Sequence, residues 1–249
     1  MSSWSSSVQA STYGDSFADV YDRWYPDISD TDATVAQLLD LETHGLIIEL
    51  GIGTGRLALR LATAGRSVRG IDSSVAMVER LREKPGGAEI DVIIGDMACE
   101  PLGSPGEASL VFIAFNTFFN LITAEAQRSC LANVVEVLKP GGRFALEAFV
   151  PPPIDQLERT GLSTKTVDLD RVVLTATETN AEAQTISGQH IEISDTGIRL
   201  RPWMLRFAAP DEIDAMAEAA GLSLETRHSS WSGDRFEPTS ETHVSVYRK

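Results

Sequence analysis

Apolar and polar positions follow two different patterns along this chain. Up to residue 150, short runs that are apolar throughout alternate with segments of helical periodicity. The expected strands are residues 45–50, 67–72, 91–96, 108–115 and 143–149. The expected helices are residues 12–25, 32–41, 56–65, 73–84 and 124–138. Strands and helices in this order predict an α/β fold with a doubly wound parallel sheet.

The pattern changes after the three prolines at residues 151–153. Stretches rich in Thr, Val and Ile follow, without helical periodicity, and they predict an antiparallel insertion of three or four strands. These stretches are residues 164–170, 171–180, 183–194 and 197–208. Helical periodicity returns between Pro210 and Gly221, and a β pair is expected to close the chain.

A glycine-rich turn follows the first apolar strand, in the sequence LIIELGIGTGRLALRLA. Glycine lets the backbone approach a ligand, and the next helix offers free N–H groups. The turn has the spacing Gly51-x-Gly53-x-Gly55, so that Arg56 stands where the dinucleotide-binding motif has its third glycine. No Gly-Lys-Ser/Thr of a P-loop follows. The turn predicts a ligand site without identifying the ligand.

Three carboxylates end three consecutive predicted strands around this turn. Glu49 lies two residues before Gly51, Asp72 ends the second strand, and Asp96 ends the third. Ligands of open α/β sheets bind outside the carboxyl ends of the strands, so these acids are expected to meet there. Asp72 could accept hydrogen bonds from both ribose hydroxyls. Asp96 could accept one from the exocyclic amine of adenine, with Met97 beside the ring.

Taken together, these motifs resemble those of the class I S-adenosylmethionine-dependent methyltransferases. The matching segments are ELGIGTG, GIDSSVAM, GDM and VLKPGGRFAL, and the resemblance covers roughly residues 12–150. It implies a Rossmann-like, seven-stranded sheet whose last strand is antiparallel, with S-adenosyl-L-methionine as the cofactor. The expected domains are a disordered tail (1–11), a helical cap with the cofactor-binding core (12–150), the antiparallel insertion over the substrate site (151–208), and a C-terminal helix and β pair completing the core (209–249).

The resemblance also implies which residues bind the cofactor. The glycine turn would face its methionine part, with Glu49 near the amino acid end. Phe115 and Asn116 would lie near the sulfonium. The full implied set is Tyr13, Tyr21, Glu49, Gly51, Gly53, Gly55, Asp72, Ser73, Met77, Asp96, Met97, Phe115 and Asn116.

The N-terminal segment TYGDSFADVYDRWY is expected to be a single amphipathic helix, with Phe17, Tyr21 and Trp24 on one face. It resembles the aromatic cap of small-molecule methyltransferases, including aminosugar N,N-dimethyltransferases. The resemblance implies that Tyr13 closes over the cofactor near the transferring methyl group. Tyr21 would touch the cofactor's carboxylate. Simple packing of the helix is the alternative for Tyr21, Trp24 and Tyr25.

Methyl transfer is an in-line displacement, so much of the catalysis can come from positioning the reactants. Candidate catalytic residues are Tyr13, His190 as a general base in the insertion, and Glu147, which could orient an amine. The candidate substrate-binding residues are Trp24, Asn116, Phe119, His190 and Arg201. The two cysteines show no metal-binding spacing, and no metal is expected.

The absence of a strong base constellation favours N-methylation, because a neutral amine needs no base whereas a hydroxyl does. An aminosugar or a peptide amino terminus would be such an acceptor. The alternatives are an O-methyltransferase acting on a hydroxyl or carboxylate, an NAD(P)-binding oxidoreductase, which Arg56 opposes, and a non-catalytic cofactor-binding protein on the same fold.

Charge and composition narrow the partners further. A net charge of −15 opposes a nucleic-acid partner, because phosphate backbones are bound by clustered Lys and Arg. No apolar run approaches the ~20 residues that span a bilayer. The start MSSWSSSVQAS lacks the features of a signal peptide, so no membrane partner and a cytoplasmic location are expected. The insertion could cover a small-molecule substrate, or pair its strand edges with a second subunit in a homodimer.

Overall fold

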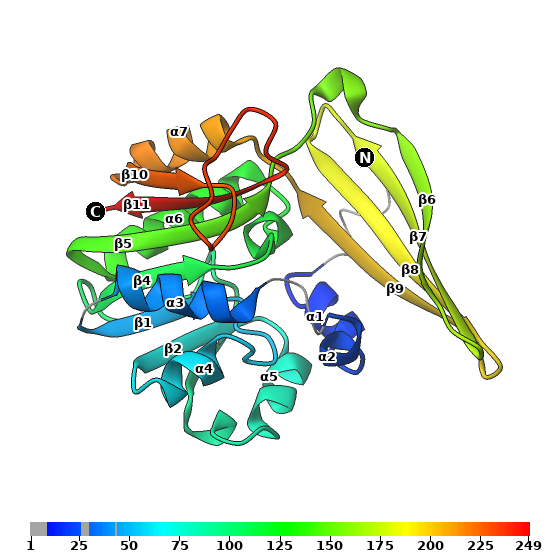
Figure 1. Cartoon of the computed structure of the whole chain (residues 1–249), viewed down its shortest axis with the longest axis horizontal. Helices are drawn as coiled ribbons and strands as arrows, with labels where there is room; N and C mark the ends of the chain where they lie inside the picture. The colour runs from blue at the N-terminus through cyan, green and yellow to red at the C-terminus, as the bar shows by residue number, and fades with distance from the viewer. Residues whose placement is uncertain (1–8, 26–29, 43) are drawn as a thin grey trace.

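The computed structural model describes residues 9–25, 30–42 and 44–249, which form two separate sheets (Figure 1). The larger sheet has seven strands in the order β10-β11-β5-β4-β1-β2-β3. Its strands are β1 (Leu46–Leu50), β2 (Ser67–Asp72), β3 (Asp91–Ile94), β4 (Ala108–Ile113), β5 (Leu138–Phe149), β10 (Ser223–His228) and β11 (Thr242–Arg248). Strands β1 to β5 pair in parallel, whereas β11 is antiparallel to β5 and to β10. The predicted Rossmann-like sheet with an antiparallel last strand is confirmed.

Helices cover both faces of this sheet because its central strands are apolar on both sides, and every residue of β4 is buried. One core cluster includes side chains of α6 and α7, and the other includes side chains of α3, α4 and α5. The helices are α3 (Thr31–Leu41), α4 (Ala58–Thr63), α5 (Val75–Arg82), α6 (Ala124–Val137) and α7 (Pro210–Ala220). Within the described residues, no helix is long and apolar enough to cross a membrane.

The helix ends follow capping chemistry. The side chains of Asp30, Ser74 and Thr123 each accept a backbone N–H from three residues further on, at the starts of α3, α5 and α6. Pro210 begins α7, and Gly221 ends it in a left-handed conformation, as the sequence predicts.

The prediction of one helix over residues 12–25 is wrong. The structure has two short helices, α1 (Thr12–Phe17) and α2 (Tyr21–Trp24), here called the cap. Phe17 and Val20 are both buried, and they pack with Met77 of α5. We attribute the break to tertiary packing, because α1 contacts both α5 and β9. Of the tail expected over 1–11, residues 1–8 lie outside the described residues, and 10–11 form a turn that leads into α1.

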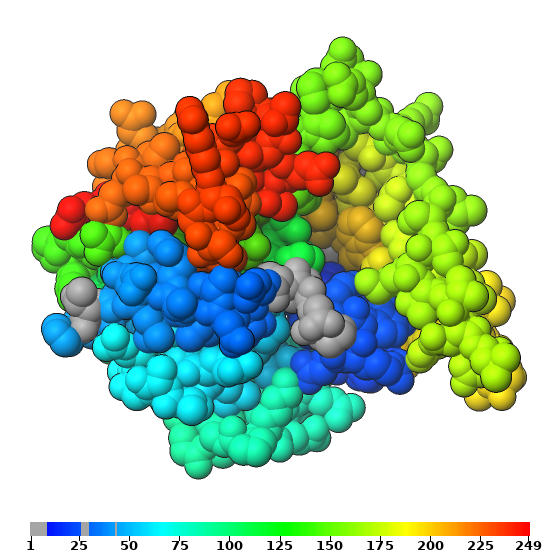
Figure 2. All heavy atoms as spheres, viewed as in Figure 1, coloured from blue at the N-terminus to red at the C-terminus, as the bar shows by residue number. Residues whose placement is uncertain are grey.

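The insertion is an antiparallel sheet in the order β6-β7-β8-β9, so of the expected three or four strands the structure has four. These are β6 (Thr160–Val167), β7 (Arg171–Asn180), β8 (Thr185–Ser194) and β9 (Gly197–Arg206). One face of this sheet is turned toward the cap, and the other points away from the molecule (Figure 1). The molecular surface is hollowed between the insertion and the loop that precedes β11 (Figure 2). Three short 3-10 helices complete the fold: η1 (Gly87–Glu89), η2 (Thr117–Asn120) and η3 (Ile154–Gln156).

Candidate active site

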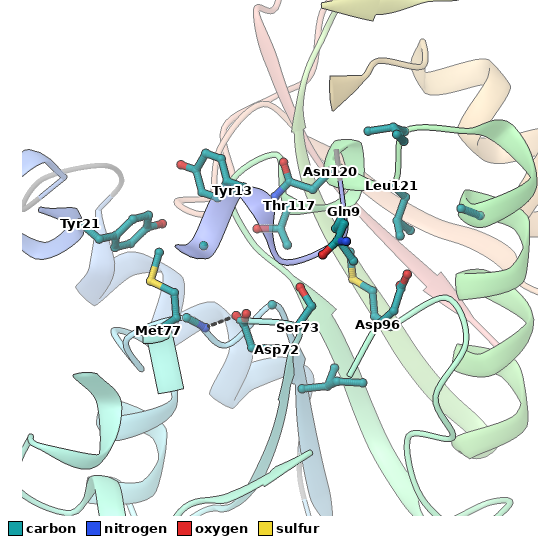
Figure 3. Close-up of a pocket in the computed structure, with 18 residues that line it drawn as sticks. Gln9, Tyr13, Tyr21, Asp72, Ser73, Met77, Asp96, Thr117, Asn120 and Leu121 are labelled. Atoms are coloured by element: carbon teal, nitrogen blue, oxygen red, sulfur yellow. Dashed lines mark hydrogen bonds between the residues drawn. The ribbon is translucent and has the colours of Figure 1, made fainter. Parts of the chain in front are cut away.

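A cavity of about 240 Å³ lies at the carboxyl ends of β1, β2 and β3, beneath the cap (Figure 3). It is enclosed by α1 and α2, the glycine turn, the residues after β2 and β3, η2 and the start of α6. Nine residues of the expected cofactor set line it: Tyr13, Tyr21, Gly51, Gly53, Asp72, Ser73, Met77, Asp96 and Met97.

The glycine turn forms the part of the cavity wall next to β1. Gly51, Gly53 and Gly55 have φ values of 73°, 56° and 79°, a left-handed conformation that side chains disfavour. A Cβ on Gly51 would lie 2.3 Å from Thr117 Cγ2, so η2 packs directly against the turn. Gly55 does not line the cavity, and a Cβ there would lie 2.2 Å from Leu81 Cδ1 of α5. Its role is close packing.

Asp72 organises the turns on both sides of it. The backbone N–H of Gly53 donates to Asp72 Oδ2 at 2.8 Å, and the N–H of Ser74 donates to Oδ1 at 2.9 Å. Burial raises the pKa of Asp72, although these bonds oppose the shift. A carboxylate held in this way at a cavity is placed to accept further hydrogen bonds from a ligand.

Asp96 and Leu121 mark one end of the cavity, and Tyr21 and Met77 mark the other (Figure 3). The N–H of Ala98 donates to Asp96 Oδ1 at 2.8 Å, which fixes the carboxylate at the start of the loop after β3. A ligand that reaches from Asp96 to Tyr21 must therefore be elongated.

The cap closes the cavity from above. A Cβ on Gly14 would lie 2.4 Å from Ser74 Cβ, so α1 sits against the start of α5. Burial is the main cause that raises the pKa of Tyr13 far above its usual value and the pKa of Tyr21 to about 12. Both phenols are therefore neutral hydrogen-bonding groups at physiological pH.

Glu49 lies behind the cavity lining, and its charge acts on Tyr21 and Asp72. Its side chain is buried, and Oε2 has no hydrogen-bond partner among the described residues. Burial raises the pKa of Glu49 to about 8, with Arg56 opposing the shift. An orphaned carboxylate oxygen of this kind fits a cationic ligand group, such as the amino group of the expected cofactor.

Phe115 and Asn116 lie outside the cavity lining. They form a turn between β4 and η2, and the residues that follow, Thr117 and Asn120, reach the cavity instead. The expected contact of Phe115 and Asn116 with the cofactor is therefore not seen in the cavity lining, which begins one residue later, at Thr117. Neither Thr117 nor Asn120 was among the site residues expected from the sequence.

Arg201 and Phe119 do not reach the cavity, and both expectations of substrate contact are corrected. The Arg201 side chain is 1% exposed and donates to Asp19 Oδ1 at 2.6 Å and to Glu192 Oε2 at 3.0 Å. This guanidinium joins the insertion to the cap. Phe119 is fully buried against Phe149, with ring centroids 4.9 Å apart.

His190 lies on the inner face of the insertion, among the aromatic rings of Phe17, Trp24 and Trp203. It is buried, its Nδ1 is 2.8 Å from Thr175 Oγ1, and neither His190 nor Trp24 lines the cavity. Burial, with smaller effects of nearby cations, lowers the pKa of His190 to about 4. A group of this pKa is a weak general base at neutral pH. The geometry therefore favours a packing role for this ring.

Several residues that line the cavity were not predicted from the sequence. Gln9 and Ala10 fall in the segment expected to be a tail, and α1 carries them over the cavity. The remaining ones are small or apolar residues without a chemical signature: Gly14, Ile71, Leu121, Ile122 and Ala126.

Comparison with known proteins gives consistent matches. A family model described as a methyltransferase domain matches residues 47–142. The structure of the CcbJ methyltransferase from Streptomyces caelestis superposes with a TM-score of 0.87 at 39% identity, covering 97% of this chain and 99% of that chain. This likeness includes the cap and the insertion as well as the core.

Two curated relatives match over shorter lengths. The cypemycin N-terminal methyltransferase from a Streptomyces species is 25% identical over 207 residues, which is 82% of each chain. An uncharacterized methyltransferase from Anoxybacillus flavithermus is 30% identical over 149 residues, or 59% of this chain. That match spans 65% of the relative's own length, slightly less than two thirds.

Proposed function

Because this chain belongs to the S-adenosylmethionine-dependent methyltransferases, we propose that it methylates an amine nitrogen of a small molecule. The cofactor is S-adenosyl-L-methionine, which when bound supplies a methyl group on an electrophilic sulfonium. The name of the cypemycin N-terminal methyltransferase, a relative matched over 82% of each chain, agrees with an amine acceptor.

The observation that carries the proposal is the chemistry of the cavity lining. Its phenols, Tyr13 and Tyr21, have raised pKa values, and its carboxylates, Asp72 and Asp96, already accept backbone N–H groups. Among the described lining residues there is no histidine or lysine. A hydroxyl acceptor requires a base, whereas a neutral amine attacks with its own lone pair. This lining therefore suits an amine.

The chain's own residues bind and enclose the reactants in this proposal. Asp72 accepts from the ribose hydroxyls, Asp96 accepts from the adenine amine, and Glu49 faces the amino group of the methionine part. Tyr13 and Tyr21 cover the cavity from the cap and exclude water from it. Catalysis then comes mainly from holding the acceptor nitrogen in line with the methyl group.

A matched acceptor panel tests the proposal. The purified enzyme is incubated with S-adenosylmethionine and with aminosugars, peptides with free amino termini, and analogues in which a hydroxyl replaces the amine. We expect a mass increase of one methyl group on the amines only. The rate should rise with pH up to the acceptor's own amine pKa, because only the neutral amine reacts.

Three outcomes would contradict the amine proposal. Faster methylation of the hydroxyl analogues would indicate an O-methyltransferase. A rising limb at the same pH for acceptors of different pKa would indicate a base on the enzyme. Intact binding of S-adenosylhomocysteine without transfer to any acceptor would favour a non-catalytic cofactor-binding protein.

The proposed partners and location rest on the sequence. A net charge of −15 disfavours nucleic acid, so the substrate is proposed to be a small molecule. The cytoplasmic location also stays a prediction.

A homodimer is proposed from the outer face of the insertion sheet. Leu162, Ile193, Ile198 and Leu200 are all exposed there, from 40% for Ile193 to 73% for Leu162. Ile198 and Leu200 alternate with residues that pair with the cap, such as Arg201, so they lie on the opposite face. Four strands of this length give a face of about 600 Å². That is close to the ~800 Å² that each partner buries in a standard interface.

We expect light scattering to give twice the 27.0 kDa chain mass, because pairing of two copies through these exposed apolar residues removes them from water. Replacing Ile198 and Leu200 by glutamate should give a monomer. Leu224→Glu is the matched control, since Leu224 is 44% exposed on β10 of the other sheet. A monomeric unmodified chain, or a dimer that persists in the double variant, would contradict this interface.

A further inference from the structure

The geometry points to Glu147 as a positioning residue, which fixes the cavity-lining segment η2 by accepting a backbone hydrogen bond. In this assignment its negative charge does not act on the substrate. The inference concerns the wall of the cofactor cavity, so it rests on the cofactor and not on the nature of the acceptor.

The turn that leads into η2 is strained. Phe115 and Asn116 have φ values of 45° and 57°, and both are non-glycine residues in the left-handed region. Two consecutive residues of this kind persist only where the surrounding structure holds them in place. Some interaction must therefore secure this turn.

Three hydrogen bonds join the turn to the end of β5. Glu147 Oε2 accepts from the N–H of Phe115 at 2.7 Å, and the Glu147 carbonyl accepts from the N–H of Asn116 at 3.2 Å. In return, Asn116 Oδ1 accepts from the N–H of Phe149 at 2.7 Å. Each side supplies a side-chain acceptor to the backbone of the other, and we call this arrangement the bracket.

The bracket determines where η2 sits. Thr117 and Asn120 of η2 line the same cavity as Tyr13 of the cap (Figure 3). Thr117 Cγ2 would be 2.3 Å from a Cβ on Gly51, so the segment packs against the glycine turn without spare room. A relaxed Phe115–Asn116 turn would therefore displace the cavity wall on the side of the methionine part.

The sequence analysis considered Glu147 as a group that orients an amine, and the geometry assigns it a different role. Glu147 does not line the cavity, and its Oε2 is engaged by a backbone N–H. A neutral carbonyl oxygen can accept the same hydrogen bond. Glutamine should therefore replace Glu147 in the bracket, although it could not replace a carboxylate that holds a cationic amine.

The test compares Glu147→Gln with Glu147→Ala by calorimetric titration of S-adenosylhomocysteine, which needs no acceptor. We expect the alanine variant to weaken binding about tenfold or more, because the Phe115 N–H loses its acceptor. The glutamine variant should stay within about threefold of the unmodified protein. With a working amine acceptor, kcat should follow the same order, and the pH profile of the glutamine variant should be unchanged.

Glu225→Ala provides the matched control. Glu225 Oε2 accepts from Arg143 Nε of β5 at 2.7 Å, far along the strand from Glu147. Its loss should lower the melting temperature and leave the affinity for S-adenosylhomocysteine unchanged, which separates a positioning effect from general instability.

Asn116→Gly gives a second, independent measurement, and it decides the matter if Glu147→Ala does not fold. Glycine adopts the left-handed conformation readily but removes the acceptor for Phe149 N–H, so binding should again weaken. Equal losses in the glutamine and alanine variants would show that the charge matters and would overturn the inference. Unchanged binding in Glu147→Ala, or in Asn116→Gly, would also overturn it. Failure of methyl transfer alone bears only on the proposed amine acceptor.

Discussion

Replacing Asp72 by alanine is expected to raise the dissociation constant for S-adenosylhomocysteine about a hundredfold or more, which corresponds to roughly 3 kcal/mol. The Asp72 carboxylate has two roles. It accepts the N–H groups of Gly53 and Ser74, which shapes the walls of the cavity, and it faces the expected ribose. Alanine removes both kinds of bond. Calorimetric titration measures the effect directly.

Two further variants sharpen this test. Asp72→Asn keeps one acceptor oxygen but turns an amide N–H₂ toward a backbone N–H, so its affinity should fall nearly as far. Asp91→Ala is the control, because Asp91 starts β3 at the opposite end of the strands and pairs with Arg69. Its affinity should be unchanged. An unchanged affinity in Asp72→Ala would remove Asp72 from the site.

The melting temperature of the Asp72 variants should change little compared with their affinity. Burial raises the pKa of Asp72, so the charged carboxylate is held in the free protein against its own desolvation. Substitution of Asp72 removes the desolvation penalty of the carboxylate, which stabilises the fold. It also breaks two hydrogen bonds, which destabilises the fold, so the two effects oppose each other. A binding residue is expected to show this imbalance between stability and function.

The core of the site was predictable because parallel strands bring their carboxyl ends to one edge of a sheet. Asp72 and Asp96 are 24 positions apart in sequence, yet both follow neighbouring parallel strands, β2 and β3. The periodicity of apolar residues was enough to place those strands, and the position of each acid at a strand end then placed it at the cavity.

Contacts between distant segments were not predictable in the same way. Arg201 looked like a substrate ligand because cations alternate along β9, but its partner Asp19 lies 182 residues away in the chain. No local sequence pattern predicts an ion pair between residues so far apart in the chain. The break in the cap has the same origin, since α1 meets both α5 and β9. The position of Gln9 at the cavity depends on that packing and could not be read from residues 1–11.

Replacing Glu49 by glutamine is expected to stabilise the cofactor-free protein above pH 8. The Glu49 side chain is 5% exposed and its Oε2 has no partner among the described residues. Burial raises the pKa of this carboxyl from 4.5 to about 8. Ionisation of Glu49 in the folded state therefore lowers the free energy of unfolding by up to about 5 kcal/mol. Glutamine has the shape of the neutral acid and carries no charge.

The sign of the pH dependence follows from linkage. The folded protein binds the Glu49 proton more tightly than the unfolded chain does, so this contribution to stability is complete below pH 4.5. It is lost as the pH rises to about 8. Urea unfolding across this range should show the unmodified protein losing stability relative to Glu49→Gln. Glu225→Gln is the control of opposite sign, because Arg143 lowers the pKa of Glu225 and its charged form favours folding.

Glu49→Gln should also weaken cofactor binding. If Glu49 faces the cationic amino group of the methionine part, binding lowers the Glu49 pKa and releases a proton near pH 7. Titrations of S-adenosylhomocysteine in buffers of different ionisation enthalpy should detect that proton in the unmodified protein and not in Glu49→Gln. Tight binding by the variant, with the same proton release, would place the amino group elsewhere. A gain in stability together with a loss of affinity would show that this buried carboxylate is kept for the ligand, because the free protein folds better without its charge.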